Sequence, residues 1–254
     1  MMQPIIRDPE MPIIKVNDTR IVCRLVLFDL DGTLVDKDFR NRSLAEARMN
    51  AVQRLAGRDA AQLWATLSGV DPATFNVDNR GPLSKAPRKE DITVAAAAIW
   101  LKRMDWFRAR ELAAEAYAQA DAQQSREFRP ILVPGAEAAL RSMRGTGLMM
   151  GVATNGSGRT AREIMRSIGV EALFDVFVGA DEVPEGKPAP DMLLAACERM
   201  GVRAVDAVYV GDEVADAAAG RAAGVAAVIA VRPEGDISGY TRLVVDSVAH
   251  IRAG

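Results

Sequence analysis

Short apolar runs and helical patterns alternate along most of this sequence. Runs that are closed by turn residues predict buried strands. These strands are expected at residues 25–28, 148–153, 174–180, 207–216 (a strand and its loop), 225–231 and 243–245. Helical spacing follows at 137–144, 159–168 and in a stretch that ends at Met200. Because strands that alternate with helices build parallel sheets covered on both faces, we predict a doubly wound α/β domain.

The pattern differs after Asp36, where helical spacing continues for about ninety residues without an alternating strand pattern. Segment 37–130 is therefore predicted to be a helical bundle inserted between 21–36 and 131–254, which together form the α/β domain. Core packing is the expected role of three aromatic residues in this bundle, Trp64, Trp100 and Trp106.

The first twenty residues form a separate extension. Ile13–Val16 and 19–22 are β-prone and flank an Asn-Asp pair, so a small hairpin is expected there. Packing against the domain is its expected role.

Composition excludes several classes of protein. The chain has 254 residues, of which 49% are hydrophobic and 26% charged, with a net charge of −2, so it lacks the basic excess of a nucleic-acid binder. No apolar run approaches the roughly 18 residues of a membrane span. Met1–Glu10 lacks the apolar core of a signal peptide. We therefore expect a cytoplasmic protein with neither nucleic-acid nor membrane partners, in which Cys23 and Cys197 are buried free thiols. Its oligomeric state is not encoded in these patterns.

The candidate chemistry begins at the first predicted core strand, which ends in Asp29 and Asp31. Side chains alternate along a strand, so both carboxylates leave its carboxyl end on the same side. Two acids this close repel each other, and Mg²⁺ is a cation that such a pair binds together with phosphate and water. A simple turn is the alternative interpretation.

Three later segments carry further candidates. Thr154 and Asn155 follow the next strand and precede a helix, an arrangement that binds phosphate but also occurs in ordinary turns. Lys187 lies between Gly and Pro, so its ammonium is either fixed at a site or simply on the surface. Asp212 and Asp216 are four residues apart and can lie near one side of the turn that enters a helix.

These segments carry a resemblance to a known family. The sequence FDLDGTLVD, from Phe28 to Asp36, resembles the first motif of the haloacid dehalogenase superfamily in its phosphatase and phosphotransferase branch. The segments around Thr154, Lys187 and Asp212 are similar to its other three motifs, in the same order. The resemblance implies a Rossmann-like core with a helical cap of the C1 type, as in phosphatases of the phosphoglycolate type.

The resemblance also implies residue roles. Asp29 is expected to be the nucleophile and Asp31 the general acid and base, while Thr154, Asn155 and Lys187 bind the phosphoryl group. Mg²⁺ is expected on Asp29, Asp31 and Asp212. Asp216 is expected to orient Lys187 or a metal-bound water. Glu213 departs from the pattern, because many relatives have a small hydroxyl residue there.

A basic loop between the predicted helices of the insert, around residues 78–90, has two interpretations. Its cations Arg80, Lys85, Arg88 and Lys89 either form a solvated surface or read an anionic group of the substrate.

The favoured function is a Mg²⁺-dependent phosphatase that hydrolyses a small phosphorylated metabolite, of the phosphoglycolate type, through an aspartyl-phosphate. A phosphotransferase or phosphomutase stays open, since either needs only an acceptor hydroxyl that outcompetes water. A non-catalytic binding module is the third hypothesis, which the complete set of motif residues argues against. The dehalogenase branch is disfavoured because its members lack an acid at the position of Asp31.

Overall fold

The computed structural model describes residues 11–86 and 88–254. The expected absence of a signal peptide concerns Met1–Glu10, which lie outside the described residues. The chain divides into two compact units, one formed by the segment up to Asp36 together with Pro130–Gly254, and the other by Lys37–Arg129.

A six-stranded parallel sheet forms the centre of the α/β unit. Its strand order is β5-β4-β3-β6-β7-β8, and every neighbouring pair is parallel. The strands are β3 (Leu25–Phe28), β4 (Met149–Thr154), β5 (Val176–Gly179), β6 (Ala207–Glu213), β7 (Ala227–Glu234) and β8 (Val244–Val245). All four residues of β3 are buried, as expected of a central strand that packs on both faces.

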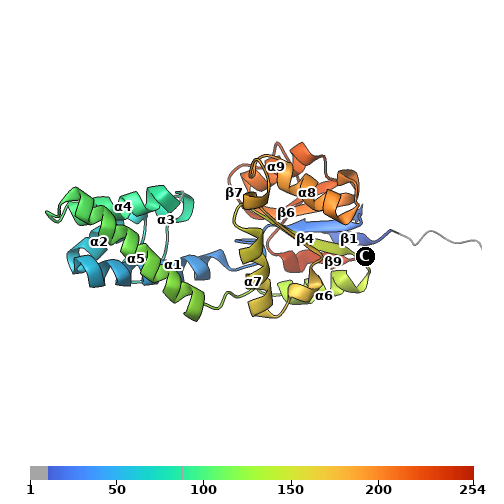
Figure 1. Cartoon of the computed structure of the whole chain (residues 1–254). Helices are drawn as coiled ribbons and strands as arrows, with labels where there is room; N and C mark the ends of the chain where they lie inside the picture. The colour runs from blue at the N-terminus through green and yellow to red at the C-terminus, as the bar shows by residue number, and fades with distance from the viewer. Residues whose placement is uncertain (1–10, 87) are drawn as a thin grey trace, which may run out of the picture. The chain divides into compact units, whose positions relative to one another are not determined.

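Helices cover both faces of this sheet, which confirms the doubly wound α/β prediction (Figure 1). The helices α6 (Ala136–Gly145) and α7 (Gly158–Ile168) lie on one face, and α8 (Asp191–Met200) and α9 (Val214–Ala223) lie on the other. The β3–β6 register pairs Leu27 with Tyr209 and Phe28 with Val210, so the carboxyl ends of these two strands lie side by side.

A second, antiparallel sheet forms from the two ends of the described chain. It has the order β2-β1-β9, with β1 (Ile13–Val16), β2 (Thr19–Val22) and β9 (Ile251–Ala253). Ile14, Val16 and Ile251 are completely buried in the same apolar cluster as residues of α6. The N-terminal segment therefore extends the core, and its pairing with β9 has no signal in the local sequence pattern.

The second unit is helical. It consists of α1 (Lys37–Ala56), α2 (Arg58–Ser68), α3 (Pro82–Lys85), α4 (Arg88–Trp100) and α5 (Trp106–Glu127). Its core is built largely of alanine, with Trp64 and Tyr117 as the bulkiest buried side chains.

The expectation that all three tryptophans pack in this core was wrong. Trp64 is fully buried, but Trp100 is 49% exposed and Trp106 is 36% exposed. Trp100 ends α4 and Trp106 begins α5, so both lie beside the turn between these helices rather than within the bundle.

Candidate active site

Strand β3 delivers Asp29 to the carboxyl edge of the sheet. The Asp29 amide donates to the Val210 carbonyl at 2.8 Å, which continues the β3–β6 ladder by one residue, and the side chain is 10% exposed. The loop that follows is tight, because the amide of Gly32 donates to the carbonyl of Val35 at 2.9 Å. Asp31 lies in this loop and is half-buried.

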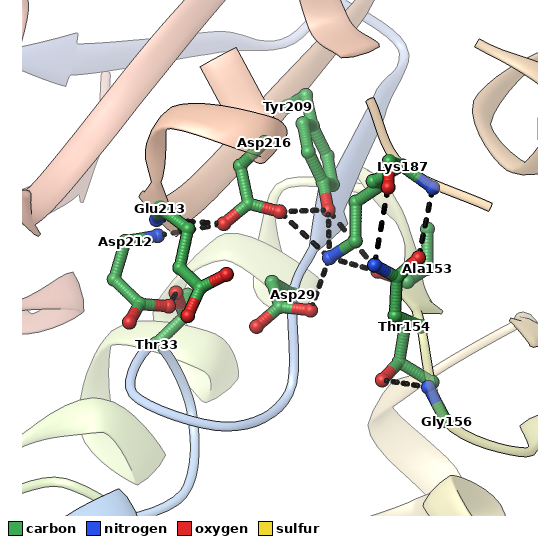
Figure 2. Close-up of polar contacts among 11 residues, drawn as sticks. Asp29, Thr33, Ala153, Thr154, Gly156, Lys187, Tyr209, Asp212, Glu213 and Asp216 are labelled. Atoms are coloured by element: carbon green, nitrogen blue, oxygen red, sulfur yellow. Dashed lines mark hydrogen bonds and ion pairs between the residues drawn. The ribbon is translucent and has the colours of Figure 1, made fainter. Parts of the chain in front are cut away.

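The ammonium of Lys187 lies among oxygen atoms from three other elements (Figure 2). It donates to Asp29 Oδ1 at 2.5 Å, to Asp216 Oδ1 at 2.6 Å and to Tyr209 Oη at 3.0 Å. The Ala153 carbonyl is 3.4 Å away. Only 5% of the Lys187 side chain is exposed, so this lysine is not the surface residue of the alternative interpretation.

Asn155 holds the main chain of Lys187. Its Oδ1 accepts from the Lys187 amide at 2.8 Å, and its Nδ2 donates to the Lys187 carbonyl at 3.3 Å. Both ends of the Asn155 amide therefore serve to anchor the lysine loop to the end of β4. This use of Asn155 differs from the direct phosphate contact that the resemblance implies.

Asp216 is held by four hydrogen bonds. Oδ1 accepts from Lys187 and Tyr209, and Oδ2 accepts from the amides of Asp212 at 3.0 Å and Glu213 at 2.9 Å. Glu213 is the N-cap of α9, and its amide is one of the two that Asp216 binds.

Two glycines allow the acids to approach the backbone. A Cβ on Gly32 would lie 2.2 Å from Asp212 Oδ2, and a Cβ on Gly211 would lie 2.4 Å from the Cβ of Asp216. Gly32 also has a φ of +89°, which side chains disfavour. Asp212 is further oriented by Thr33, whose buried Oγ1 donates to Asp212 Oδ1 at 3.1 Å.

Thr154 ends β4 and is 4% exposed. Its Oγ1 accepts from the Gly156 amide at 3.1 Å, which leaves the hydroxyl proton for another acceptor. The amide of Gly158, at the start of α7, donates to Asp181 Oδ1 at 3.2 Å. An acid of the protein therefore occupies one amide of the helix terminus that the sequence predicted to bind phosphate.

The electrostatics of this cluster are unbalanced. Oxygen atoms of Asp29, Asp212 and Asp216 all lie within 4.8 Å of one another, and the Lys187 ammonium pairs with Asp29 and Asp216. Burial raises the pKa of Asp29 to about 8, because the stabilising effect of Lys187 does not offset desolvation and the two other carboxylates. Burial alone would lower the pKa of Lys187, but contacts with Asp29, Tyr209 and Asp216 hold it well above its usual value.

The oxygen donors fit a hard divalent cation. The buried group of Asp29, Asp212 and Asp216 could bind a metal ion. Both oxygens of Asp216 are committed to hydrogen bonds, whereas only Oδ1 of Asp29 accepts one from a described residue. Asp29 and Asp212 are therefore the side chains of this group best suited to a cation, which would also favour the ionised form of Asp29.

The predicted substrate cations lie in the helical unit and are exposed. Arg80 pairs with Asp78, with Nε 3.2 Å from Oδ1. Arg88 donates to Asp121 through Nη1 at 2.9 Å, and its guanidinium lies 5.1 Å from the centre of the Tyr117 ring. Lys85 ends α3 and Lys89 lies in the first turn of α4. Pro87 in the same loop is outside the described residues.

Two residues of the site, Tyr209 and Thr33, have contacts that the sequence pattern did not predict. A polar-tipped aromatic residue in the otherwise aliphatic strand β6, three residues before Asp212, was the available signal for Tyr209. Thr33 was noted within its motif, but its bond to Asp212 spans 179 positions and has no local pattern.

Known proteins of similar sequence identify the family of this chain. Residues 23–224 match the family of haloacid dehalogenase-like hydrolases. The chain belongs to this family.

Two curated relatives of this hydrolase are phosphoglycolate phosphatases. The one from Xylella fastidiosa (strain Temecula1) is 33% identical over 208 residues, covering 82% of this chain and 80% of the relative. The one from Xanthomonas campestris pv. campestris (strain 8004) is 32% identical over 210 residues, covering 82% and 83%.

The fold is shared with solved members of the superfamily. A HAD-superfamily hydrolase of subfamily IA, variant 1, from Geobacter sulfurreducens PCA superposes with a TM-score of 0.63 at 22% identity, covering 89% of this chain and 93% of that one. The chain is thus a haloacid dehalogenase-like hydrolase whose curated relatives are phosphatases. Within residues 11–86 and 88–254, no helix is long and apolar enough to cross a membrane.

Proposed function

We propose that this hydrolase is a Mg²⁺-dependent phosphatase that cleaves small phosphomonoesters through an aspartyl-phosphate on Asp29. The observation that carries the proposal is the buried contact between Asp29 and the Lys187 ammonium, with Asp212 and Asp216 beside it. Burial removes water from the Asp29 carboxylate and the contact with Lys187 fixes its orientation, and both effects favour a nucleophile. The ammonium also offsets the charge of an incoming phosphoryl group.

In the first step, an oxygen of Asp29 attacks phosphorus and the bond from phosphorus to the ester oxygen breaks. Asp31 protonates the leaving oxygen. In the second step, Asp31 takes a proton from the water that attacks the aspartyl-phosphate, which releases inorganic phosphate and regenerates Asp29.

The remaining residues bind and position the phosphoryl group. Lys187 and the hydroxyl of Thr154 donate to phosphoryl oxygens, and Asn155 supports this contact by anchoring the Lys187 main chain. Asp216 orients Lys187. Asp29, Asp212 and the main-chain carbonyl of Asp31 would hold Mg²⁺, which supplies charge neutralisation at the phosphoryl group.

The proposed substrate class is a short phosphomonoester with a second anionic group, such as phosphoglycolate. Support comes from the two phosphoglycolate phosphatases at 32–33% identity, which align over about four fifths of the chain. One or more of Arg80, Lys85 and Arg88 would bind the second anion.

The test is phosphate release by the purified chain from p-nitrophenyl phosphate and from a panel of phosphorylated metabolites, with Mg²⁺ and with excess chelator. We expect Mg²⁺-dependent hydrolysis of the aryl phosphate and the highest kcat/KM for a short anionic phosphomonoester. Absence of phosphate release from every compound in the presence of Mg²⁺ would contradict the proposal. Appearance of the phosphoryl group on an added sugar hydroxyl instead of on water would identify a phosphotransferase.

A further inference from the structure

Tyr209 is an uncharged side chain beside the charged groups of Asp29, Lys187 and Asp216. It lies in the middle of β6, opposite Leu27 of β3, and is completely buried. Its Oη lies 3.0 Å from the Lys187 ammonium, 3.0 Å from Asp216 Oδ1 and 3.1 Å from the Ala153 carbonyl (Figure 2). The phenol therefore joins the end of β4, the lysine loop and the start of α9.

The protons in this cluster can be counted. The ammonium of Lys187 has three protons and the hydroxyl of Tyr209 has one. Four oxygen acceptors surround them: Asp29 Oδ1, Asp216 Oδ1, the Ala153 carbonyl and Tyr209 Oη. Lys187 donates to Asp29, Asp216 and Tyr209, and Tyr209 gives its one proton either to Asp216 Oδ1 or to the Ala153 carbonyl.

In both cases the Tyr209 oxygen stays an acceptor for Lys187. The lysine nitrogen lies 3.0 Å from Tyr209 Oη and 3.4 Å from the Ala153 carbonyl, so the phenol oxygen is the better third acceptor. Burial holds the pKa of Tyr209 well above its usual value, so the hydroxyl keeps its proton at neutral pH. Tyr209 is then the third acceptor of the ammonium, after the two carboxylates.

Three acceptors fix the orientation of an ammonium group, whereas two leave it free to rotate about the line that joins them. A lysine has four rotatable bonds, and burial alone does not aim its charge. A phenylalanine would fill the same space in β6, so the packing of the strand does not require the hydroxyl.

We propose that Tyr209 is a positioning residue for catalysis, and that its hydroxyl holds the Lys187 ammonium in the orientation that faces Asp29 and the phosphoryl group. The inference rests on the proposed phosphatase activity. It assigns to Tyr209 an effect on turnover that is transmitted through Lys187.

The test compares Tyr209→Phe with Tyr117→Phe in the full chain, using p-nitrophenyl phosphate and Mg²⁺. Tyr117 is a matched control, because it is also fully buried and its hydroxyl also bonds a carboxylate and a second polar group, but in the helical unit. We expect Tyr209→Phe to lower kcat by roughly 10- to 100-fold, the usual effect of removing a residue that orients a catalytic group, with KM changed less than about threefold. Tyr117→Phe should leave kcat within about twofold of the wild type.

A double-mutant cycle identifies the route of the effect. In a Lys187→Arg background there is no ammonium to orient, so adding Tyr209→Phe should lower kcat by less than about twofold. An equal loss in both backgrounds, or a kcat for Tyr209→Phe equal to that of the wild type, would overturn the inference. A wild-type chain without phosphatase activity would instead contradict the proposed function and is recognised before any variant is made.

If Tyr209→Phe does not fold, replacing Tyr209 by 3-fluorotyrosine tests the same role of its hydroxyl. The chain has three tyrosines, so growth of a Tyr117→Phe, Tyr240→Phe variant on 3-fluorotyrosine places the modified ring at position 209 alone. Fluorine weakens Oη as an acceptor, and kcat should fall while KM is retained. An unchanged kcat in the fluorinated protein would overturn the inference.

Discussion

Two buried clusters in this protein use the same residue types for different ends. In the helical unit, Arg48 pairs with Asp91, and Tyr117 donates to Asp91 Oδ1 at 2.8 Å while accepting from Trp64 Nε1 at 3.0 Å. In the α/β unit, Lys187 pairs with two carboxylates and with the hydroxyl of Tyr209. Each cluster thus combines a buried cation, a carboxylate and a phenol.

The difference between them is the charge balance. In the helical cluster the buried Arg48 and Asp91 balance each other, and burial raises the pKa of Asp91 against the opposing effects of Arg48, Tyr117 and Arg88. The cluster around Lys187 brings the carboxylates of Asp29, Asp212 and Asp216 within 4.8 Å of one another, and burial raises the pKa of Asp29 to about 8 despite its contact with Lys187. A balanced cluster joins helices, whereas an excess of buried negative charge is kept where a cation is to be bound.

The largest effect is expected for the nucleophile. Asp29→Asn should lower turnover of p-nitrophenyl phosphate by roughly 10³-fold or more, because the amide cannot attack phosphorus. The variant should fold, since it removes a desolvated charge from an acidic cluster. Kinetics at high enzyme concentration and a thermal melt check both points. Retained activity in a clean preparation would refute the role of Asp29.

Changes in the helical cluster should lower the stability of the protein and not the rate of the chemical step. Arg48→Met leaves Asp91 buried without its cation and should lower the free energy of unfolding by roughly 3–5 kcal/mol. All three tryptophans lie between residues 64 and 106, so tryptophan fluorescence during urea unfolding reports on the helical unit. The double variant Arg48→Met, Asp91→Leu should recover part of the loss. Equal stability of wild type and Arg48→Met would contradict the distinction between the clusters.

Metal binding should sharpen the comparison. Mg²⁺ at about 100 times its Kd should stabilise the wild type by about 2.7 kcal/mol, and excess chelator should abolish both this gain and turnover. Asp212→Asn should need more Mg²⁺ for the same stabilisation and the same rate, as seen by calorimetry and kinetics. Asp206→Asn, at an acid whose carboxylate bonds Arg203 at 2.7 Å, is the control and should titrate like the wild type. Full activity without any metal on the protein would exclude the metal site.

The smallest effect is expected for the basic loop of the helical unit. Single alanine replacements test Arg80, Lys85, Arg88 and Lys89. Loss of a cation that binds the second anion of the substrate should cost about 1–3 kcal/mol in kcat/KM for an anionic phosphomonoester, and little for an aryl phosphate without that anion.

Arg88 has its own control. Asp121→Asn removes the same ion pair and leaves the cation in place. If Arg88 binds the substrate, Arg88→Ala should lower kcat/KM for the anionic phosphomonoester more than for the aryl phosphate, and Asp121→Asn should not. Equal losses on both substrates, or none, for all four replacements would mean that the loop is only a solvated surface.

Several features were accessible from the sequence because they depend on local order. Alternating apolar runs and helices predicted the doubly wound sheet, and the turn residues after β3, β4 and β6 marked its carboxyl edge. Asp29, Thr154 and Asp212 could be singled out because each stands at the end of an apolar run that predicts a buried strand. The exposure of Trp100 and Trp106 was missed because hydrophobic content does not reveal where a helix ends.

Long-range contacts required the tertiary structure. The bond from Thr33 to Asp212, the anchoring of Lys187 by Asn155 and the contact of Tyr209 with Lys187 join residues 179, 32 and 22 positions apart. The pairing of β1 with β9 likewise joins the two ends of the described chain. The sequence by itself determined which residue types stand at the end of each strand, because hydrophobic periodicity and turn formation depend on a few neighbouring residues. Only the tertiary structure decided which polar groups form hydrogen bonds with one another, since these bonds need distances of about 3 Å between elements that lie far apart in the chain.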